Sequence, residues 1–541
     1  MNLKEWIFTT DHKRVGVLYL IGSIAAFGVA GVMAMLMRLE LSQLGPTLTA
    51  NPTQYNIWLY AHGAVMILGF QIPALTGFFA NYCIPLMIGA KDVAFPRVNA
   101  LSVWLFYVGI ILAILTFFIP DPPDVMWTGY PPYSILTTGN TALYTFTVLI
   151  LGFASIIGGV NFLTTVVYMR APGLTWNKLN IFVWCTLAAF VLQLIFVPVL
   201  GTAVTLISFD KYLGTHFFDP ARGGDVLTYQ NLFWFYSHPA VYVIFLPFFG
   251  VVYEIVATFA RNRVFNYAMV VYGGIFGIVA LSGVVWVHHL YVSGMADWIR
   301  IGQMVTTLLI SVPVGLMVIG LVGTLYKGAI SFETPMMYAL GVIFLFLIGG
   351  LTGIPLALPS LTLHLSDTYY VVGHFHYVMA VAGTFAIFGG VYYWFPKITG
   401  RMYSEFWGKA GFWLTFVGVN IVFWIMMDVG VKGMPRRYYD YAQFPQFEHA
   451  HQIMTFGAGI IGIGFAVAVI NWIVGAMRGK PAGDNPWGSM SLEWTTVSPP
   501  PHGNWPTPPS VSEEWHPYGY GDGRVSSDEA ILHTPDVPRV S

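Results

Sequence analysis

The chain has 541 residues, of which 56% are hydrophobic and only 9% are charged. Its apolar residues form long blocks, so a lipid bilayer rather than water must cover much of its surface. The formal net charge is −1 and there is no basic tract, which argues against a nucleic-acid partner. Cys83 and Cys185 fall in or near apolar blocks, so neither a disulfide framework nor a cysteine metal site is indicated.

Twelve apolar segments are each long enough to cross a bilayer, for which a helix needs about 20 residues. We therefore predict an all-α, polytopic membrane protein with a twelve-helix domain over residues 16–477. The predicted spans are roughly 16–38, 57–88, 97–119, 143–168, 180–208, 231–260, 266–292, 303–326, 335–357, 368–395, 410–427 and 453–477.

Loop charge predicts the orientation. Most Lys and Arg residues outside the spans fall in residues 1–15, in the even-numbered connections and after residue 478. Positively charged loops stay in the cytoplasm, so both ends of the chain are predicted to be cytoplasmic, in a bacterial inner membrane. Arg436 and Arg437 are an exception, because their connection is predicted to lie outside. Residues 478–541 are rich in Pro and Gly and predict an extended cytoplasmic tail.

Six histidines inside the spans form the predicted functional site. With the predicted topology imposed, all six lie within roughly 10 Å of the outer boundary. A single intramembrane histidine can simply be a hydrogen-bonded polar residue between helices. Six at one depth on four helices favour metal binding, because neutral imidazole is the commonest metal ligand. The six are His62, His238, His288, His289, His374 and His376.

The stretch "VVGHFHYVM", residues 371–379, indicates two separate centres. Residues two apart on an α-helix point about 200° away from each other. His374 and His376 therefore cannot bind one metal ion, but each can serve a different centre on opposite sides of the helix. His62 could supply the second axial bond to one of them, which would give a six-coordinate haem suited to electron transfer.

The other three histidines predict a metal site of a different kind. His238 with the adjacent pair His288 and His289 makes an all-imidazole ligand set that suits copper, zinc or iron. Tyr242 follows His238 by one helical turn and is therefore within side-chain reach of it. Beside a metal, its phenol could deliver a proton and an electron.

These residues lie in motifs that resemble the haem-copper oxidases, specifically subunit I of the A-type cytochrome c oxidases. The motifs cover nearly the whole chain and include "TTDHKRVGVLYL", "AHGAVMI", "GAKDVAFPRVN", "HPAVY", "VWVHH" and "GMPRRYYDY". The resemblance implies that His62 and His376 bind a low-spin haem A and that His374 binds a high-spin haem A. It also implies that the remaining three histidines hold copper, and that His238 is covalently bonded to Tyr242.

Further cofactor contacts are implied by the same resemblance. Arg38 in "MRLEL" matches an arginine that contacts the low-spin A-type haem. Asp367 matches a magnesium ligand, although Ser366 replaces a histidine that usually helps to bind this ion. Bidentate pairing between arginine and a carboxylate makes propionate binding physically sensible. The residues that match propionate contacts are Trp127, Arg436 and Arg437.

Several positions depart from the family pattern for proton transfer. Ala240 stands where a glutamate is common, although "YSHP" resembles a subgroup with a tyrosine and serine relay instead. Ala142 and Met317 stand where the family's uptake aspartate and lysine are expected, and Val314 replaces a threonine. Both usual uptake routes are therefore predicted to be missing. We predict a substitute route of polar side chains and water through Tyr236, Ser237, Thr306, Thr307 and Ser311.

The leading functional prediction is a respiratory terminal oxidase that reduces O₂ to water, with His238 and Tyr242 as catalytic residues. One alternative is nitric oxide reduction on the same scaffold. Such enzymes usually carry glutamates near a non-haem iron, but Glu254 is twelve residues beyond Tyr242 and roughly 18 Å further inward. Another alternative is a membrane haem protein that only conducts electrons.

The chain lacks a two-cysteine copper site of the kind that accepts electrons from cytochrome c. The resemblance therefore implies a subunit II with a copper electron-entry site, together with subunit III and other respiratory subunits. Cytochrome c is the predicted donor, and direct binding of a quinol is the alternative. A lipid membrane surrounds the assembly.

Overall fold

The computed structural model describes residues 3–520 and 531–532. Eleven helices in these ranges are long and apolar enough to cross a membrane, which confirms the predicted polytopic, all-α class. They are α2 (His12–Glu40), α3 to α4 (Pro52–Met87), α5 (Pro96–Leu115), α7 (Thr141–Tyr168), α8 (Ile181–Leu213), α9 (Val226–Ala260), α11 (Asp297–Leu325), α12 (Thr334–Ala357), α14 to α15 (Tyr369–Thr399), α16 (Glu405–Val431) and α17 (Glu448–Arg478).

Two of these long helices contain π-helical turns. The first consists of α3 (Pro52–Ala64), η1 (Val65–Gln71), η2 (Pro73–Phe79) and α4 (Ala80–Met87). The second consists of α14 (Tyr369–Phe375), η7 (His376–Val381) and α15 (Ala382–Thr399). The remaining short elements are α1 (Leu3–Ile7), α6 (Tyr133–Leu136), η3 (Trp176–Lys178), η4 (Pro220–Arg222), α13 (Pro359–Leu365), η8 (Pro445–Phe447), η9 (Leu492–Thr495) and the antiparallel strands β1 (Ser510–Val511) and β2 (Ile531–Leu532).

The seventh predicted span, 266–292, is shorter than expected. Its helix comprises η5 (Met269–Ile275) and α10 (Phe276–Ser282), and the chain then turns into the 3₁₀ segment η6 (Trp286–Leu290). The helix ends at a glycine followed by two β-branched valines, all of which have low helix propensity. Thr306 of α11 donates to the backbone oxygen of Val284 at 2.9 Å, which satisfies one carbonyl freed by the turn.

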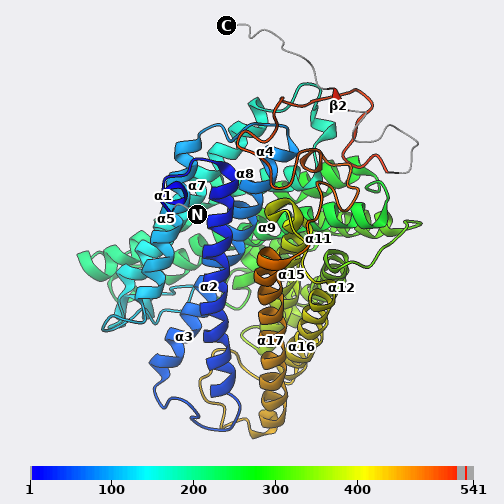
Figure 1. Ribbon diagram of the computed structural model, residues 1–541. Helices are drawn as coiled ribbons and strands as arrows, with labels where there is room; N and C mark the ends of the chain where they lie inside the picture. Colours follow the sequence, from blue (N-terminus) through cyan, green and yellow to red (C-terminus); the bar gives the residue numbers. More distant parts are fainter. Residues whose placement is uncertain (1–2, 521–530, 533–541) are drawn as a thin grey trace.

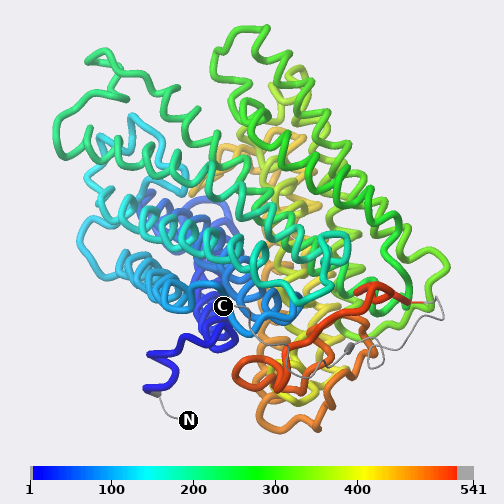
Figure 2. Tube along the Cα trace, turned by 90° about the horizontal axis from the view of Figure 1, so that it is seen from above, coloured from blue at the N-terminus to red at the C-terminus, as the bar shows by residue number. Residues whose placement is uncertain are grey.

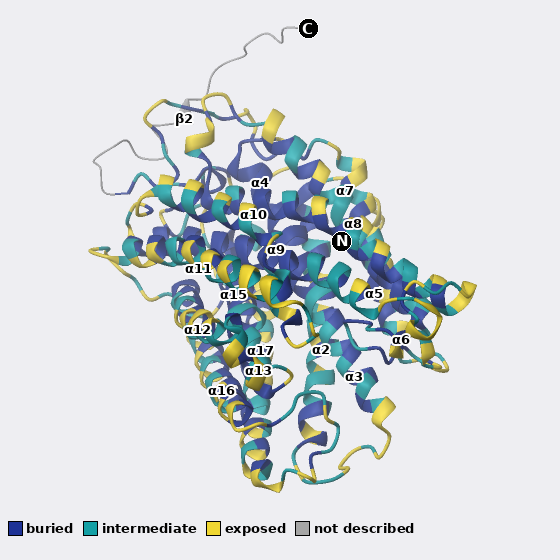
Figure 3. Ribbon diagram, turned by 180° about the vertical axis from the view of Figure 1, so that it is seen from behind, coloured by how far each residue is buried: buried dark blue, intermediate teal, exposed yellow. Residues whose placement is uncertain are grey.

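The helices do not all run in one direction. In Figure 1, α2, α16 and α17 run steeply, whereas α9 and α11 run across the view, and the view from above in Figure 2 agrees. Helix α9 lies at the centre and is dark blue, hence buried, along most of its length in Figure 3. This central position brings α9 into contact with the helices that carry the other predicted ligands.

The segment after α17 packs against the helix ends instead of extending freely. Figure 2 shows this orange and red segment lying across the ends of several helices. Trp494, Trp505 and Trp515 are buried, and the Tyr518 hydroxyl donates to Glu254 of α9 at 2.5 Å. The segment is irregular, as its Pro and Gly content predicts, but within the described residues it forms a cap. The predicted extended tail is corrected in this respect.

Candidate functional site

His62 and His376 form a pair suited to the two faces of one haem. Their ring centroids are 6.4 Å apart and their ring planes differ by only 7°. A metal–imidazole bond is about 2 Å long, so rings on opposite sides of one metal ion have centroids roughly 6 Å apart. Each Nδ1 lies near a backbone oxygen, that of Ala30 at 3.0 Å and that of Val372 at 2.8 Å. These contacts orient both rings and leave each Nε2 for a metal.

His374 faces a different helix from His376. Its Nδ1 lies 2.9 Å from the backbone oxygen of Gly349 on α12. The ring of His376 instead stacks on Phe423 of α16, with centroids 4.4 Å apart. A Cβ added at Gly353 of α12 would come within 2.9 Å of His374 Cε1, so this glycine keeps space beside the imidazole. The two imidazoles therefore contact different helices, α12 and α16.

The other three histidines converge as the sequence predicts. The potential ligand atoms of His238, His288 and His289 all lie within 4.8 Å of one another. His238 Nδ1 is 3.4 Å from His289 Nε2, close to the ~3.5 Å that three ligands at about 2 Å would show around one metal ion. Trp234 stacks on His289 with centroids 3.7 Å apart and 9° between the planes, which fixes that ring. The geometry fits copper with neutral imidazole ligands.

Tyr242 lies beside this trio on α9. Its ring centroid is 4.9 Å from that of His238. The Nε2 atom of His238 is buried and has no hydrogen-bond partner among the described residues. A buried ring nitrogen normally has a hydrogen-bond partner. The lack of one here indicates that Nε2 of His238 forms some other interaction. An unpartnered nitrogen next to a phenol is what a covalent bond between the two residues requires.

The two arginines of the "GMPRRYYDY" motif are placed differently from each other. Arg436 donates from Nε and Nη2 to Asp367 Oδ1, at 2.9 and 2.6 Å. Burial would raise the pKa of the Asp367 carboxyl, but Arg436 and then Arg437 hold it below its usual value. Burial and the neighbouring Arg436 lower the pKa of Arg437 to about 10. Sequence reasoning missed the ion pair of Arg436 with Asp367, because nothing in the spacing of these residues indicates it.

Comparison with known proteins identifies the family. The profile described as Cytochrome C and Quinol oxidase polypeptide I matches residues 14–460. The chain belongs to this family. It is 41% identical over 523 residues to cytochrome c oxidase subunit 1 of Thermostichus vulcanus, covering 96% of this chain and 94% of that protein. It is 43% identical over 516 residues to a probable cytochrome c oxidase subunit 1-alpha of Streptomyces avermitilis, covering 94% and 88%.

A solved structure shows the same fold. It is described as a heme-copper terminal oxidase dimer and superposes with a TM-score of 0.76 at 18% identity, covering 87% of this chain and 84% of that one. The predicted haem-copper oxidase family and terminal oxidase function are therefore confirmed for this chain. Family membership also implies haem and copper cofactors, other oxidase subunits and a multi-pass membrane location.

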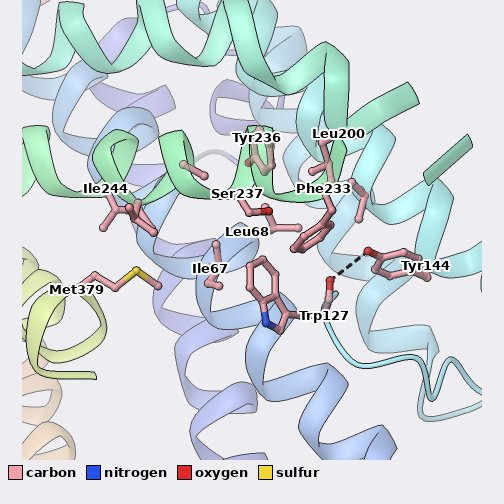
Figure 4. A pocket seen from close by; sticks show the side chains of 13 residues that line it. Ile67, Leu68, Trp127, Tyr144, Leu200, Phe233, Tyr236, Ser237, Ile244 and Met379 are labelled. Atoms are coloured by element: carbon pink, nitrogen blue, oxygen red, sulfur yellow. Dashed lines mark hydrogen bonds between the residues drawn. The ribbon is translucent and has the colours of Figure 1, made fainter. Parts of the chain in front are cut away.

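In this family member, Trp127, Tyr236 and Ser237 line a cavity beside α9, shown in Figure 4. The rest of its wall is mainly apolar, with Ile67 and Met379 among its residues. Ser237 Oγ is buried and has no partner within the described part of the chain. Buried polar atoms of this kind are commonly satisfied by ordered water. Ser237 therefore offers one bonding site for a water molecule in a wall that is otherwise mainly apolar.

The other three predicted relay residues do not join this cavity. Thr307 Oγ1 lies 3.2 Å from Nδ1 of His288, a member of the histidine trio. Thr306 is bound to the backbone at the end of α10. Ser311 is exposed, and its hydroxyl donates to a carbonyl of its own helix. The five residues therefore do not form one continuous chain, and Ser311 points away from the site.

A second cavity, which the sequence did not reveal, adjoins the first, and Leu68 lines both of them. Asn81, Ser102 and Ser155 line it, and Asn99 donates to Asn81 at 2.5 Å. Asp92, in the loop before α5, is close by, because it bonds to the backbone of His12, whose ring contacts the Asn81 carbonyl at 2.6 Å. Burial raises the pKa of Asp92 to about 6.

This cavity corrects one expectation. Ala142 lies in the first turn of α7, whereas Ser155, which lines the second cavity, lies in the second half of that helix. The position of Ala142 is therefore remote from the polar cavity, and its identity says nothing about entry on that side. Asp92 was visible in the "GAKDVAFPRVN" motif, but it is loop packing that buries it. The prediction that polar entry is missing is not supported there.

Proposed function

We propose that this chain reduces O₂ to water at a centre formed by a high-spin haem on His374 and a copper ion on the trio of His238, His288 and His289. Electrons reach it through a low-spin haem held by His62 and His376. The convergence of the histidine trio beside Tyr242 is the single observation that carries this proposal. When bound, the two metals supply the redox chemistry and the site at which O₂ binds.

The chain itself contributes position and protons. Backbone acceptors fix the ring orientation of His62, His374 and His376, and this fixes the tautomer available for a metal. Tyr242 is close enough to the trio to supply a proton and an electron from its phenol. We further propose that Nε2 of His238 is bonded to a ring carbon of Tyr242; this bond replaces one N–H and one C–H bond and releases two protons and two electrons, which O₂ would accept at the loaded centre.

Haem A is the proposed haem type at both sites. Arg38 supports this at the low-spin site, because a buried guanidinium favours an oxygen-bearing ring substituent. Arg437 and Trp127 are proposed to contact haem propionates, together with Arg436, whose guanidinium can share itself between a propionate and Asp367. Magnesium binding by Asp367 would compete with that ion pair, so we propose it only as a secondary role of this carboxylate.

For proton uptake, we propose two polar regions. The first is the cavity of Tyr236 and Ser237 near the histidine trio. The second is the cavity of Asn81 and Ser102, to which Asp92 is connected through His12. A partly buried acid that titrates near neutral pH is suited to collecting protons. The two cavities share Leu68 of η1 in their walls, and water passing between them would complete a route.

Cytochrome c is the proposed electron donor, because the curated relatives are named for it. A partner subunit II with a copper site is proposed to receive these electrons, with subunit III completing the assembly. The loop charges support a bacterial inner membrane with both chain ends in the cytoplasm.

Nitric oxide reduction has no support from Glu254. Its carboxylate accepts hydrogen bonds from Asn180 at 2.8 Å and Tyr518 at 2.5 Å, far along α9 from His238. The decisive experiment is steady-state turnover of the purified complex with O₂ and with NO, together with haem extraction. We expect O₂ consumption driven by reduced cytochrome c. Turnover of NO without O₂ consumption would overturn the proposal.

A further inference from the structure

Two buried carboxylates meet where the C-terminal cap, residues 479–520, packs on the ends of α8 and α9. Glu254 of α9 is 2% exposed, and Glu493 of the cap is fully buried. Neither has a basic side chain within ion-pair distance among the described residues. A buried carboxylate without a cation is costly unless hydrogen bonds or a proton compensate its charge. What compensates these two acids therefore decides how firmly the cap is held.

Glu254 accepts hydrogen bonds from both the cap and α8. The Tyr518 hydroxyl of the cap donates to it at 2.5 Å, and the Phe182 N–H in the first turn of α8 donates at 3.2 Å. The Ile181 N–H donates in turn to the Tyr518 oxygen at 2.7 Å. The carboxylate thus lies at the N-terminus of α8, where backbone N–H groups favour negative charge. Tyr518 therefore joins the cap to α8 and α9 together.

Asn180 and Ser491 connect the two acids. The Asn180 side-chain amide donates to Glu254 at 2.8 Å and to the Ser491 hydroxyl at 2.8 Å. Ser491 in turn donates to Glu493. Only one amide and one hydroxyl therefore separate the two carboxylates along this chain of bonds. At such close range and away from water, the charge on one carboxylate disfavours ionisation of the other.

Within the described residues, Lys397 of α15 is the cation that faces this pair, and it is shared. It lies near Glu493 and also near Asp484, and its ammonium donates to the backbone oxygens of Asp484 and Thr496, at 2.9 and 2.5 Å. Two carboxylates and one ammonium leave a formal negative charge unless one acid is protonated. The other titratable groups that face the acids are thiols and phenols, which are neutral near pH 7, namely Cys83, Cys185, Tyr267, Tyr393 and Tyr518.

The acid pair is not connected to the proposed redox centre along α9. Residues 243–252, which lie between Tyr242 and this cluster, are buried and carry no polar side chain. Such a stretch offers a proton no hydrogen-bonding side chain. The role of the pair therefore lies in the cap itself and not in proton delivery to the metals.

We propose that Glu254 and Glu493 hold one proton between them and form a pH-sensitive latch for the C-terminal cap. When the pH rises, this proton passes to water and both carboxylates become charged. Their repulsion acts across the bridge of Asn180 and Ser491, and it favours an opened cap in which the acids regain water. Burial raises the pKa of Glu493. Its stabilising contribution is therefore complete below the ordinary glutamate pKa and is lost as the pH rises through the raised value.

The test measures proteolytic cleavage of the cap as a function of pH in the assembled, purified oxidase in detergent micelles. A synthetic peptide of residues 500–516, cut in parallel, corrects for the effect of pH on the protease. We expect the wild-type rate to rise with pH, by as much as about tenfold per pH unit, which is the limit for release of one proton. Glu254→Gln and Glu493→Gln should each flatten this rise, because one remaining carboxylate stays charged throughout. Glu514→Gln, an exposed acid of the same cap, is the matched control and should keep the wild-type slope.

Three results would overturn this inference. A corrected wild-type rate that stays constant or falls as the pH rises would exclude the latch, whether or not either variant folds. The wild-type slope in both glutamine variants at full haem content would show that the proton is held elsewhere. Loss of the rise in Glu514→Gln would assign the titration to the surface of the cap instead of to the buried pair.

Discussion

Replacing Asn504 with Gly should release the C-terminal cap from the helix ends. Asn504 is fully buried, and its side chain donates to the Ala90 carbonyl at 2.8 Å. It also contacts His12 Nε2 at 3.0 Å and accepts from Lys13 Nζ at 2.8 Å. Its φ of 70° favours glycine, so this substitution removes the contacts without adding backbone strain.

The magnitude follows from the partners left behind. Lys13 keeps its ion pair with Asp11 at 3.1 Å, so only His12 Nε2 and the Ala90 carbonyl lose a buried partner. Each buried group left unsatisfied costs about 1–3 kcal/mol, and taking about 1.5 kcal/mol for each gives about 3 kcal/mol for the two. If the cap opens and closes faster than the protease cuts, this loss of stability raises the population of the opened cap, and hence the rate of proteolysis, on the order of 100-fold.

The assay is cleavage of the cap by a protease of broad specificity in native detergent micelles, with fragments identified by mass. His502→Ala is the matched control, since this residue is in the same loop but its side chain is 83% exposed. A surface change of this kind should alter the rate by about twofold at most. A cleavage rate for Asn504→Gly within threefold of the wild-type rate would refute the view that these buried bonds hold the cap.

Three further predictions concern the redox and proton sites. His376→Ala should remove the low-spin haem spectrum and leave CO binding, whereas His374→Ala should do the reverse; loss of both signals in either folded variant would contradict two separate centres. Tyr242→Phe should stop O₂ reduction while haem and copper contents stay at wild-type levels, and retained O₂ turnover would exclude a role for the phenol. Asp92→Asn should lower steady-state turnover about tenfold or more if this acid collects protons. Asp121→Asn, in an exposed loop, is the control and should leave turnover unchanged. Equal rates for the two variants would argue against proton entry at Asp92.

The six intramembrane histidines could be singled out in the sequence because placing an imidazole in an apolar segment costs free energy. An imidazole in an apolar segment is expensive unless it has a partner, so His374 and His376 stand out in the sequence without any structure. The acceptors that orient them, such as the carbonyls of Gly349 and Val372, could not be predicted. Backbone oxygens carry no residue-specific signal, and which of them is free depends on how helices pack.

The seventh span shows a second limit of sequence reasoning. Hydropathy continues from Met269 past His288, so the apolar pattern predicts one helix throughout. The backbone instead leaves the helix at Ser282, and the ligand pair follows in a 3₁₀ turn. Hydropathy reports that a segment is apolar, whereas the glycine and the two valines after Ser282 mark where its helix ends.

The π-helical turns next to the proposed low-spin haem could not be predicted from hydrophobic periodicity. Segment η1 begins three residues after His62, and η7 begins at His376. A π-turn widens the helix and leaves carbonyls without their usual partners, and such turns are frequent at functional sites. Gln71, the last residue of η1, donates its side-chain amide to the carbonyls of Met379 and Ala380 in η7, at 3.0 and 2.6 Å. One buried amide thus joins the two irregular segments, so the helices that carry His62 and His376 are linked by direct hydrogen bonds as well as by packing.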